Sequence, residues 1–155
     1  MSIEPRRQTI SRSLLFAAVF CVLPAALQAV EFRHALDNSA LDLKPVPGEE
    51  LTQAVKTFQE TGANAYTGDE PALAQGKDLY TKNCLVCHTR SGSGGMGPSL
   101  VSGEPLYPRV KTDVGMFEII HSGASGAMRS FAKRGMTQDE MLKIIAYVRS
   151  IKKEP

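Results

Sequence analysis

The chain has 155 residues, 43% of them hydrophobic and 22% charged, and its 18 Lys and Arg residues nearly balance 16 Asp and Glu residues. This length fits one small domain. The balance of charge and the lack of a long charged run exclude the strongly basic composition of many nucleic-acid-binding proteins.

The N-terminal residues have the pattern of a secretory signal peptide. Basic residues precede a nearly continuous apolar run at residues 14–27, and Ala29 supplies the small residue at a cleavage point. The run is too short to span a bilayer comfortably, and Pro24 interrupts it, which favours a cleaved signal over a retained anchor helix. We therefore predict cleavage after Ala29 and a periplasmic mature protein without a membrane span.

Cleavage after Ala29 changes both the charge and the cysteine count. It removes one acidic and three basic residues, which leaves 15 of each, so the mature polypeptide is formally neutral. It also removes Cys21, so Cys84 and Cys87 are the remaining cysteines. A neutral polypeptide steers a charged partner only weakly unless its charges are clustered.

Residues 30–68 are predicted to form an N-terminal arm ahead of the main domain, which covers residues 69–155. Residues 30–48 have little periodicity and contain two prolines, which indicates an extended segment. Residues 49–60 fit a short helix, because their apolar residues share one face and two glutamates stand in the first turn.

The main domain is expected to open with a helix. Asp69 is a residue type that caps helices, and Pro71 suits the first turn. Apolar residues then recur at helical spacing up to residue 84. Gly76 lies inside this helix, where a glycine lowers helix stability by about 1 kcal/mol relative to Ala. We therefore expect another helix to cross closely at Gly76.

Residues 84–88 have the sequence Cys-Leu-Val-Cys-His and are expected to form the last turn of this helix. In a C-x-x-C-H run, two thiols can each add to a vinyl group of one haem, and the next imidazole binds the iron. A C-x-x-C pair alone also fits a redox dithiol or half a zinc site. However, His88 follows directly and no second cysteine pair remains in the mature chain. The motif therefore favours one covalently bound haem c held by Cys84, Cys87 and His88, over a free or disulfide-bonded pair.

The C-terminal half alternates loops and helices. Residues 91–97 contain four glycines and are predicted to be irregular. Residues 113–121 fit a short helix, and residues 122–135 fit a loop. Thr137 and Glu140 have the spacing of a capping box, which opens a helix with a broad apolar face. Because no alternating strand pattern occurs in the sequence, we predict an all-α fold.

The second axial ligand of the iron has to come from the opposite face of the haem. The histidines and methionines of the mature chain, besides His88, are His34, His121, Met96, Met116, Met128, Met136 and Met141. Met128 lies in the loop between the two C-terminal helices, which can carry its thioether across the ring, so it is the predicted ligand. His121 and an open position are the alternatives. Thioether ligation suits electron transfer, whereas an open position permits peroxidase-like chemistry or gas sensing.

These features together resemble the class I cytochromes c. Residues 97–100, Gly-Pro-Ser-Leu, are similar to the G-P-x-L segment that follows the haem motif in that class. The resemblance implies helices packed around one haem. It also implies that the carbonyl of Pro98 accepts the Nδ1 hydrogen of His88 and so fixes the orientation of the imidazole.

A narrower resemblance rests on residues 112–117, 123–128 and 136–142. These segments are similar to the cytochrome c-L family, the electron acceptors of quinoprotein methanol dehydrogenases, and especially to the smaller form that serves the lanthanide-dependent enzyme. In that family the axial methionine lies in a G-A-x-G-x-M segment, which maps onto Met128. Residues 129–131, Arg-Ser-Phe, differ from the Gly-Pro expected after that methionine.

The resemblance implies a periplasmic one-electron carrier, which is not an enzyme. It would accept electrons from a methanol dehydrogenase that contains pyrroloquinoline quinone and pass them to a downstream cytochrome or oxidase. We expect a docking rim at the haem edge, formed by Leu85, Val86 and residues 92–97. The alternative is a haem enzyme or sensor, such as a peroxidase-like protein, or a haem subunit of another oxidoreductase.

Overall fold

A computed structural model describes residues 30–151, so the predicted signal peptide lies outside the described residues. Within this range the fold is helical and has isolated bridge pairs but no strand, which confirms the all-α prediction. The elements are α1 (Gln53–Thr61), α2 (Glu70–Asn83), α3 (Leu85–His88), η1 (Pro108–Lys111), α4 (Asp113–Ser122), η2 (Ala132–Arg134) and α5 (Gln138–Ile151). None of these helices has the length and apolar character needed to cross a membrane.

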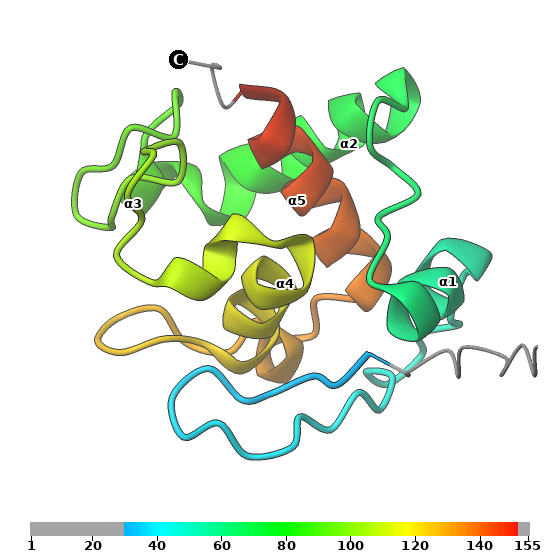
Figure 1. The fold of residues 1–155 in the computed structure, drawn as a ribbon. Coiled ribbons are helices and arrows are strands. Elements are labelled where there is room, and N and C mark those ends of the chain that lie inside the picture. The colour runs from blue at the N-terminus through cyan, green and yellow to red at the C-terminus, as the bar shows by residue number, and fades with distance from the viewer. Residues whose placement is uncertain (1–29, 152–155) are drawn as a thin grey trace, which may run out of the picture.

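Helices α2 and α5 cross closely at the centre of the molecule (Figure 1). A Cβ added to Gly76 would lie 2.2 Å from the carbonyl oxygen of Lys143, so no larger residue fits at this crossing. The rings of Tyr80 and Tyr147 meet beside it, 5.4 Å apart. The close crossing expected from the helical glycine is therefore confirmed, and it offsets the low helix propensity of Gly76.

The predicted ends of the two long helices are confirmed by their caps. The Asp69 carboxylate accepts a hydrogen bond from the Ala72 N–H at 2.8 Å and begins α2. At α5 the Thr137 N–H donates to Glu140 Oε2 at 2.9 Å, and the Glu140 N–H donates to Thr137 Oγ1 at 3.2 Å. Caps of this kind stabilise a helix by about 1 kcal/mol each.

The helix predicted at residues 49–60 instead begins at Gln53, with Thr52 as its N-cap. The reason is the position of Glu49, whose carboxylate accepts hydrogen bonds from the Gln138 N–H at 2.6 Å and the Val46 N–H at 2.9 Å. Glu49 thus joins the arm to the start of α5 rather than standing in the first turn of α1.

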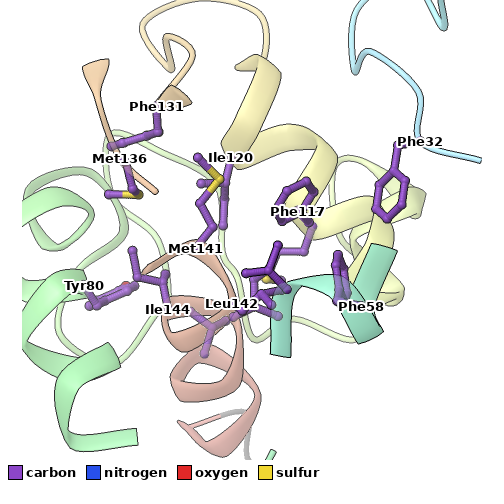
Figure 2. Close-up of a cluster of buried hydrophobic side chains, with 14 residues drawn as sticks. Phe32, Phe58, Tyr80, Phe117, Ile120, Phe131, Met136, Met141, Leu142 and Ile144 are labelled. Carbon is purple, nitrogen blue, oxygen red and sulfur yellow. The ribbon is translucent and has the colours of Figure 1, made fainter. Parts of the chain in front are cut away.

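The N-terminal arm packs onto α4 and completes the core. Figure 2 shows the rings of Phe32, Phe58 and Phe117 side by side, with centroids 5.2 to 5.6 Å apart. The Arg33 N–H also donates to Glu118 Oε1 at 2.6 Å, and this buried carboxylate pairs with Arg109 at 2.7 Å. The core is therefore continuous across residue 69, since buried residues of the arm and of the main domain share it.

The connecting loops gather away from α1. Residues 89–107 follow α3, and residues 123–131 follow α4; both lie on the side of the helices opposite α1 (Figure 1). This arrangement leaves a space that is bounded by two loop segments and by the inner faces of α4 and α5.

Candidate cofactor site

The space between the loops and helices is a cavity of about 430 Å³. Its walls are largely apolar and come from α2, α3, α4, α5 and both loops. All five residues predicted to bind the cofactor line it, namely Cys84, Cys87, His88, Pro98 and Met128. Cavities of roughly 300–1,000 Å³ with apolar walls and a few polar groups are typical of cofactor sites.

The two thiols enter the cavity from a short helical turn. Cys84 has φ −120°, which separates α2 from the four-residue helix α3, so the expected last turn is a separate element. Both cysteines are unpaired and half-buried. Burial raises the pKa of Cys84 to about 12, and the neighbouring Cys87 adds to this, while Arg134 acts in the opposite direction. A redox dithiol needs a thiol with a lowered pKa, and burial moves the pKa of Cys84 in the other direction.

His88 is held in one orientation from its far side. Its side chain is 6% exposed, and its Nδ1 lies 2.9 Å from the carbonyl oxygen of Pro98. A carbonyl can only accept a hydrogen bond, so Nδ1 carries a proton, and in the neutral imidazole Nε2 keeps a free lone pair. A Cβ on Gly97 would lie 2.7 Å from His88 Cε1, which explains why the G-P segment begins with glycine. The residues thus present an imidazole ready to bind a metal.

Met128 reaches the cavity from a different part of the chain. It lies in a narrow loop whose base is closed by the Ala124 N–H, which donates to the Met128 carbonyl at 2.8 Å. Gly123 at this base has φ +86°, and an added Cβ would lie 2.7 Å from the Ser130 nitrogen. The Ser130 hydroxyl donates to the His121 carbonyl at 2.6 Å and ties the loop to α4. Ser130 therefore anchors the loop where the family pattern has Gly-Pro.

The other candidate ligands are placed differently. His34 and His121 line a second pocket, between the arm and η2, and neither lines the large cavity. Met136 and Met141 are buried in the core. Met116 lines the cavity but is buried within α4. Met96 also lines the cavity, but it is 81% exposed and belongs to the segment that holds His88.

Sequence reasoning missed the role of Tyr80. This fully buried residue lies one turn before Cys84, and its hydroxyl donates to the Thr89 carbonyl at 2.7 Å. It thereby fixes the exit of α3, where Thr89 has φ +63°. Desolvation raises the pKa of Tyr80 to about 12. The sequence did contain an indication of this role, because a tyrosine that is buried at helical spacing needs a hydrogen-bond partner for its hydroxyl.

Comparison with known proteins finds similarity to cytochromes. A family model described as cytochrome c oxidase, cbb3-type, subunit III matches residues 71–148. Cytochrome c-L of Methylorubrum extorquens is 39% identical over 123 residues, which cover 79% of this chain and 62% of that protein. The matched region thus spans less than two thirds of that relative. The cytochrome c subunit of the bc1 complex of Corynebacterium diphtheriae is 38% identical over 97 residues, covering 61% of this chain and 33% of that subunit.

Two solved structures of similar fold are both of cytochromes cL. The crystal structure of cytochrome cL from Methylophaga aminisulfidivorans is 36% identical, with a TM-score of 0.75, and the match covers 78% of this chain and 80% of that one. Cytochrome cL from Hyphomicrobium denitrificans is also 36% identical, with a TM-score of 0.73 and coverage of 79% and 73%.

Proposed function

The chain belongs to the class I c-type cytochromes, and on that premise we propose that it is a periplasmic one-electron carrier. Its electron donor would be a methanol dehydrogenase containing pyrroloquinoline quinone, and its acceptor a downstream cytochrome or oxidase. The observation that carries this proposal is the convergence of Cys84, Cys87, His88 and Met128 on one apolar cavity.

The residues fit one covalently attached haem c. Cys84 and Cys87 would form the two thioether bonds, His88 Nε2 would be one axial ligand, and the Met128 sulfur would be the other. When bound, the haem supplies the reversible one-electron couple. A thioether ligand from Met128 would favour the reduced iron and raise the reduction potential.

The residues around the site hold the His88 imidazole in place and make the cavity apolar. The Pro98 carbonyl fixes the His88 imidazole, which also raises the basicity of the ligand nitrogen. The walls from α4 and α5 are apolar and would limit the access of water to an iron bound there. A rigid, dry site needs little reorganisation when an electron arrives, which suits a carrier better than an enzyme that admits a substrate.

The two apolar residues expected in the docking rim differ in how much of their surface is exposed. Val86 is 77% exposed on α3, beside both cysteines, as a docking residue should be. Leu85 is half-buried and packs partly against the core, so it offers less surface to the rim than Val86 does. We propose that Val86 is the apolar centre of the rim, with the glycine-rich residues 92–97 beside it. Transient redox interfaces are small, below about 1,200 Å² in total.

The methanol dehydrogenase partner is supported by the relatives named cytochrome c-L rather than by residues 112–117. Those residues have a folding role. Thr112 caps α4, and the Asp113 carboxylate pairs with Arg149 of α5 at 2.7 Å. A Cβ on Gly115 would lie 2.0 Å from the Arg109 carbonyl oxygen, so α4 and η1 pack tightly there. These contacts give the segment a packing role, so the partner proposal rests on the relatives instead.

A second candidate function is a haem subunit of a larger oxidoreductase. The matches to a cbb3-type oxidase subunit model and to a bc1 complex subunit favour it. The two functions differ in what accompanies the protein in the cell. A carrier should elute as a free cytochrome from the periplasmic fraction, whereas a subunit should be recovered with a membrane complex.

We propose that residues 1–29 direct export and are then removed. N-terminal sequencing of the protein purified from the periplasm should begin at or near Val30. Recovery of the uncleaved chain in the membrane fraction would contradict a periplasmic carrier.

The experiment that tests the partner is stopped-flow reduction of the purified oxidised protein by methanol dehydrogenase plus methanol. We expect rapid, methanol-dependent reduction that saturates with the enzyme. An unrelated cytochrome c of similar potential is the matched control. Reduction no faster than that control would reject the methanol dehydrogenase partner while leaving the electron-carrier function in place.

A further inference from the structure

The loop that carries Met128 is secured at its base but not along its tip. Gly123 and Arg129 form an isolated antiparallel bridge at the base. Beyond the base, the Phe131 N–H donates to the Ile120 carbonyl at 3.1 Å. The tip, residues 125–127, is exposed. A methionine that must stay on an iron atom therefore lies at the end of an exposed turn.

One hydrogen bond joins this tip to the rest of the described chain. The hydroxyls of Tyr107 and Ser125 are 2.5 Å apart, and both residues line the cavity. Among residues 30–151, no other hydrogen bond links residues 124–128 to a residue outside the loop. Tyr107 and Ser125 thus connect the two loop segments that bound the cavity.

The Tyr107 side of this contact is rigid. Pro108 follows Tyr107 and holds it in an extended conformation, with φ −112° and ψ 106°, at the start of η1. The next residue, Arg109, pairs with the buried carboxylate of Glu118 in α4 at 2.7 Å. Tyr107 therefore lies on a segment that an ion pair joins to α4, and its side chain can support the loop from a fixed position.

We propose that Tyr107 and Ser125 form a clasp that keeps Met128 against the iron, which makes Tyr107 a positioning residue for the axial ligand. The clasp rests on the haem site proposed above. Without it, the tip keeps its base but loses its one tether, so conformations in which the methionine leaves the iron become more populated. The population should rise about fivefold, the factor that corresponds to one typical net hydrogen bond.

Imidazole binding to the oxidised protein at neutral pH measures this population, because added imidazole takes the axial position only when the methionine leaves it. We expect Tyr107→Phe and Ser125→Ala each to raise the imidazole association constant about fivefold. The double variant should show no further increase, because either change removes the same bond. Ser125→Thr keeps a hydroxyl and should bind imidazole as the wild type does.

Tyr66→Phe is the matched control, since it removes a tyrosine hydroxyl bonded to Asp139 at 2.5 Å, and neither residue lines the cavity. The clasp is rejected if Tyr107→Phe binds imidazole like Tyr66→Phe, or if the effects of Tyr107→Phe and Ser125→Ala simply add. The methionine ligation on which the clasp rests fails separately, if the wild type lacks the thioether-to-iron band at the red end of the ferric spectrum.

Discussion

The two sides of the cavity are built in different ways. On one side, the eleven residues from His88 to Pro98 supply the proposed ligand and the carbonyl that orients it, and His88 is buried. On the other side, Met128 stands on an exposed loop that is held by Ser130 at its base and by Tyr107 at its tip. One proposed ligand is therefore positioned by its sequence neighbours, and the other by contacts between distant segments.

The largest expected effect concerns the covalent attachment of haem, on the side of the cavity that holds His88. Mass spectrometry of the denatured wild-type protein should give the polypeptide mass plus one haem, because Cys84 and Cys87 are both free to form thioethers. The double variant Cys84→Ala, Cys87→Ala should lose its haem to acid-acetone extraction. Extraction of the haem from the wild type would contradict covalent attachment.

A substitution that crowds the His88 imidazole should have the next largest effect, on the stability of the protein. Gly97→Ala places a Cβ 2.7 Å from His88 Cε1, and the ring cannot move away because the Pro98 carbonyl holds it. We expect a loss of ~1–3 kcal/mol in the free energy of unfolding of the holoprotein, measured with denaturant. Gly103→Ala is the control, since nothing lies within 4 Å of its Cβ position. Equal stability of the two variants would show that the imidazole is loosely held.

Removing the anchor at the base of the Met128 loop should have a smaller effect. The Ser130 hydroxyl donates to His121 at 2.6 Å and accepts from the Lys133 N–H at 3.1 Å, so Ser130→Ala should cost ~1–2 kcal/mol in unfolding free energy. Ser102→Ala removes a similar donor and acceptor pair within an exposed turn. It should cost less than about 0.5 kcal/mol. A larger loss in Ser102→Ala than in Ser130→Ala would overturn the role given to the anchor.

The smallest expected effect is on partner docking. Val86→Lys should slow reduction by methanol dehydrogenase about twofold to tenfold, because it places a charge at the apolar centre of the rim. The wild-type rate should depend only modestly on ionic strength, since the proposed cleavage after Ala29 would leave a formally neutral polypeptide. Leu36→Lys, at an exposed leucine of the arm, is the control. Equal rates for the two variants would place the docking surface elsewhere.

The sequence predicted the parts of the molecule that depend on near neighbours. The Asp69 cap and the capping box at Thr137 each lie within five residues, and the structure has them as expected. The residues of the C-x-x-C-H motif line one cavity, although they form a separate helix rather than the last turn of α2. Gly76 also indicated the close helix crossing, because a helical glycine needs a packing reason.

The contacts that the sequence did not predict join distant residues. Glu49 reaches Gln138 across 89 positions and so delays the start of α1. Phe32 enters the core from an arm that lacks helical periodicity. The clasp joins two polar residues in irregular loops, where neither periodicity nor a motif gives a signal. Such contacts arise only when the chain is folded, so a pattern within one segment cannot reveal them.

The ferric absorption spectrum tests the central claim most directly, because it reports whether the two sides of the cavity meet at one iron atom. The wild-type protein should show the thioether-to-iron band at the red end of the spectrum. The band should vanish in Met128→Ala and survive in Met96→Ala, whose side chain also borders the cavity but comes from the segment that holds His88. A band that survives in Met128→Ala and vanishes in Met96→Ala would contradict the account and move the ligand to Met96.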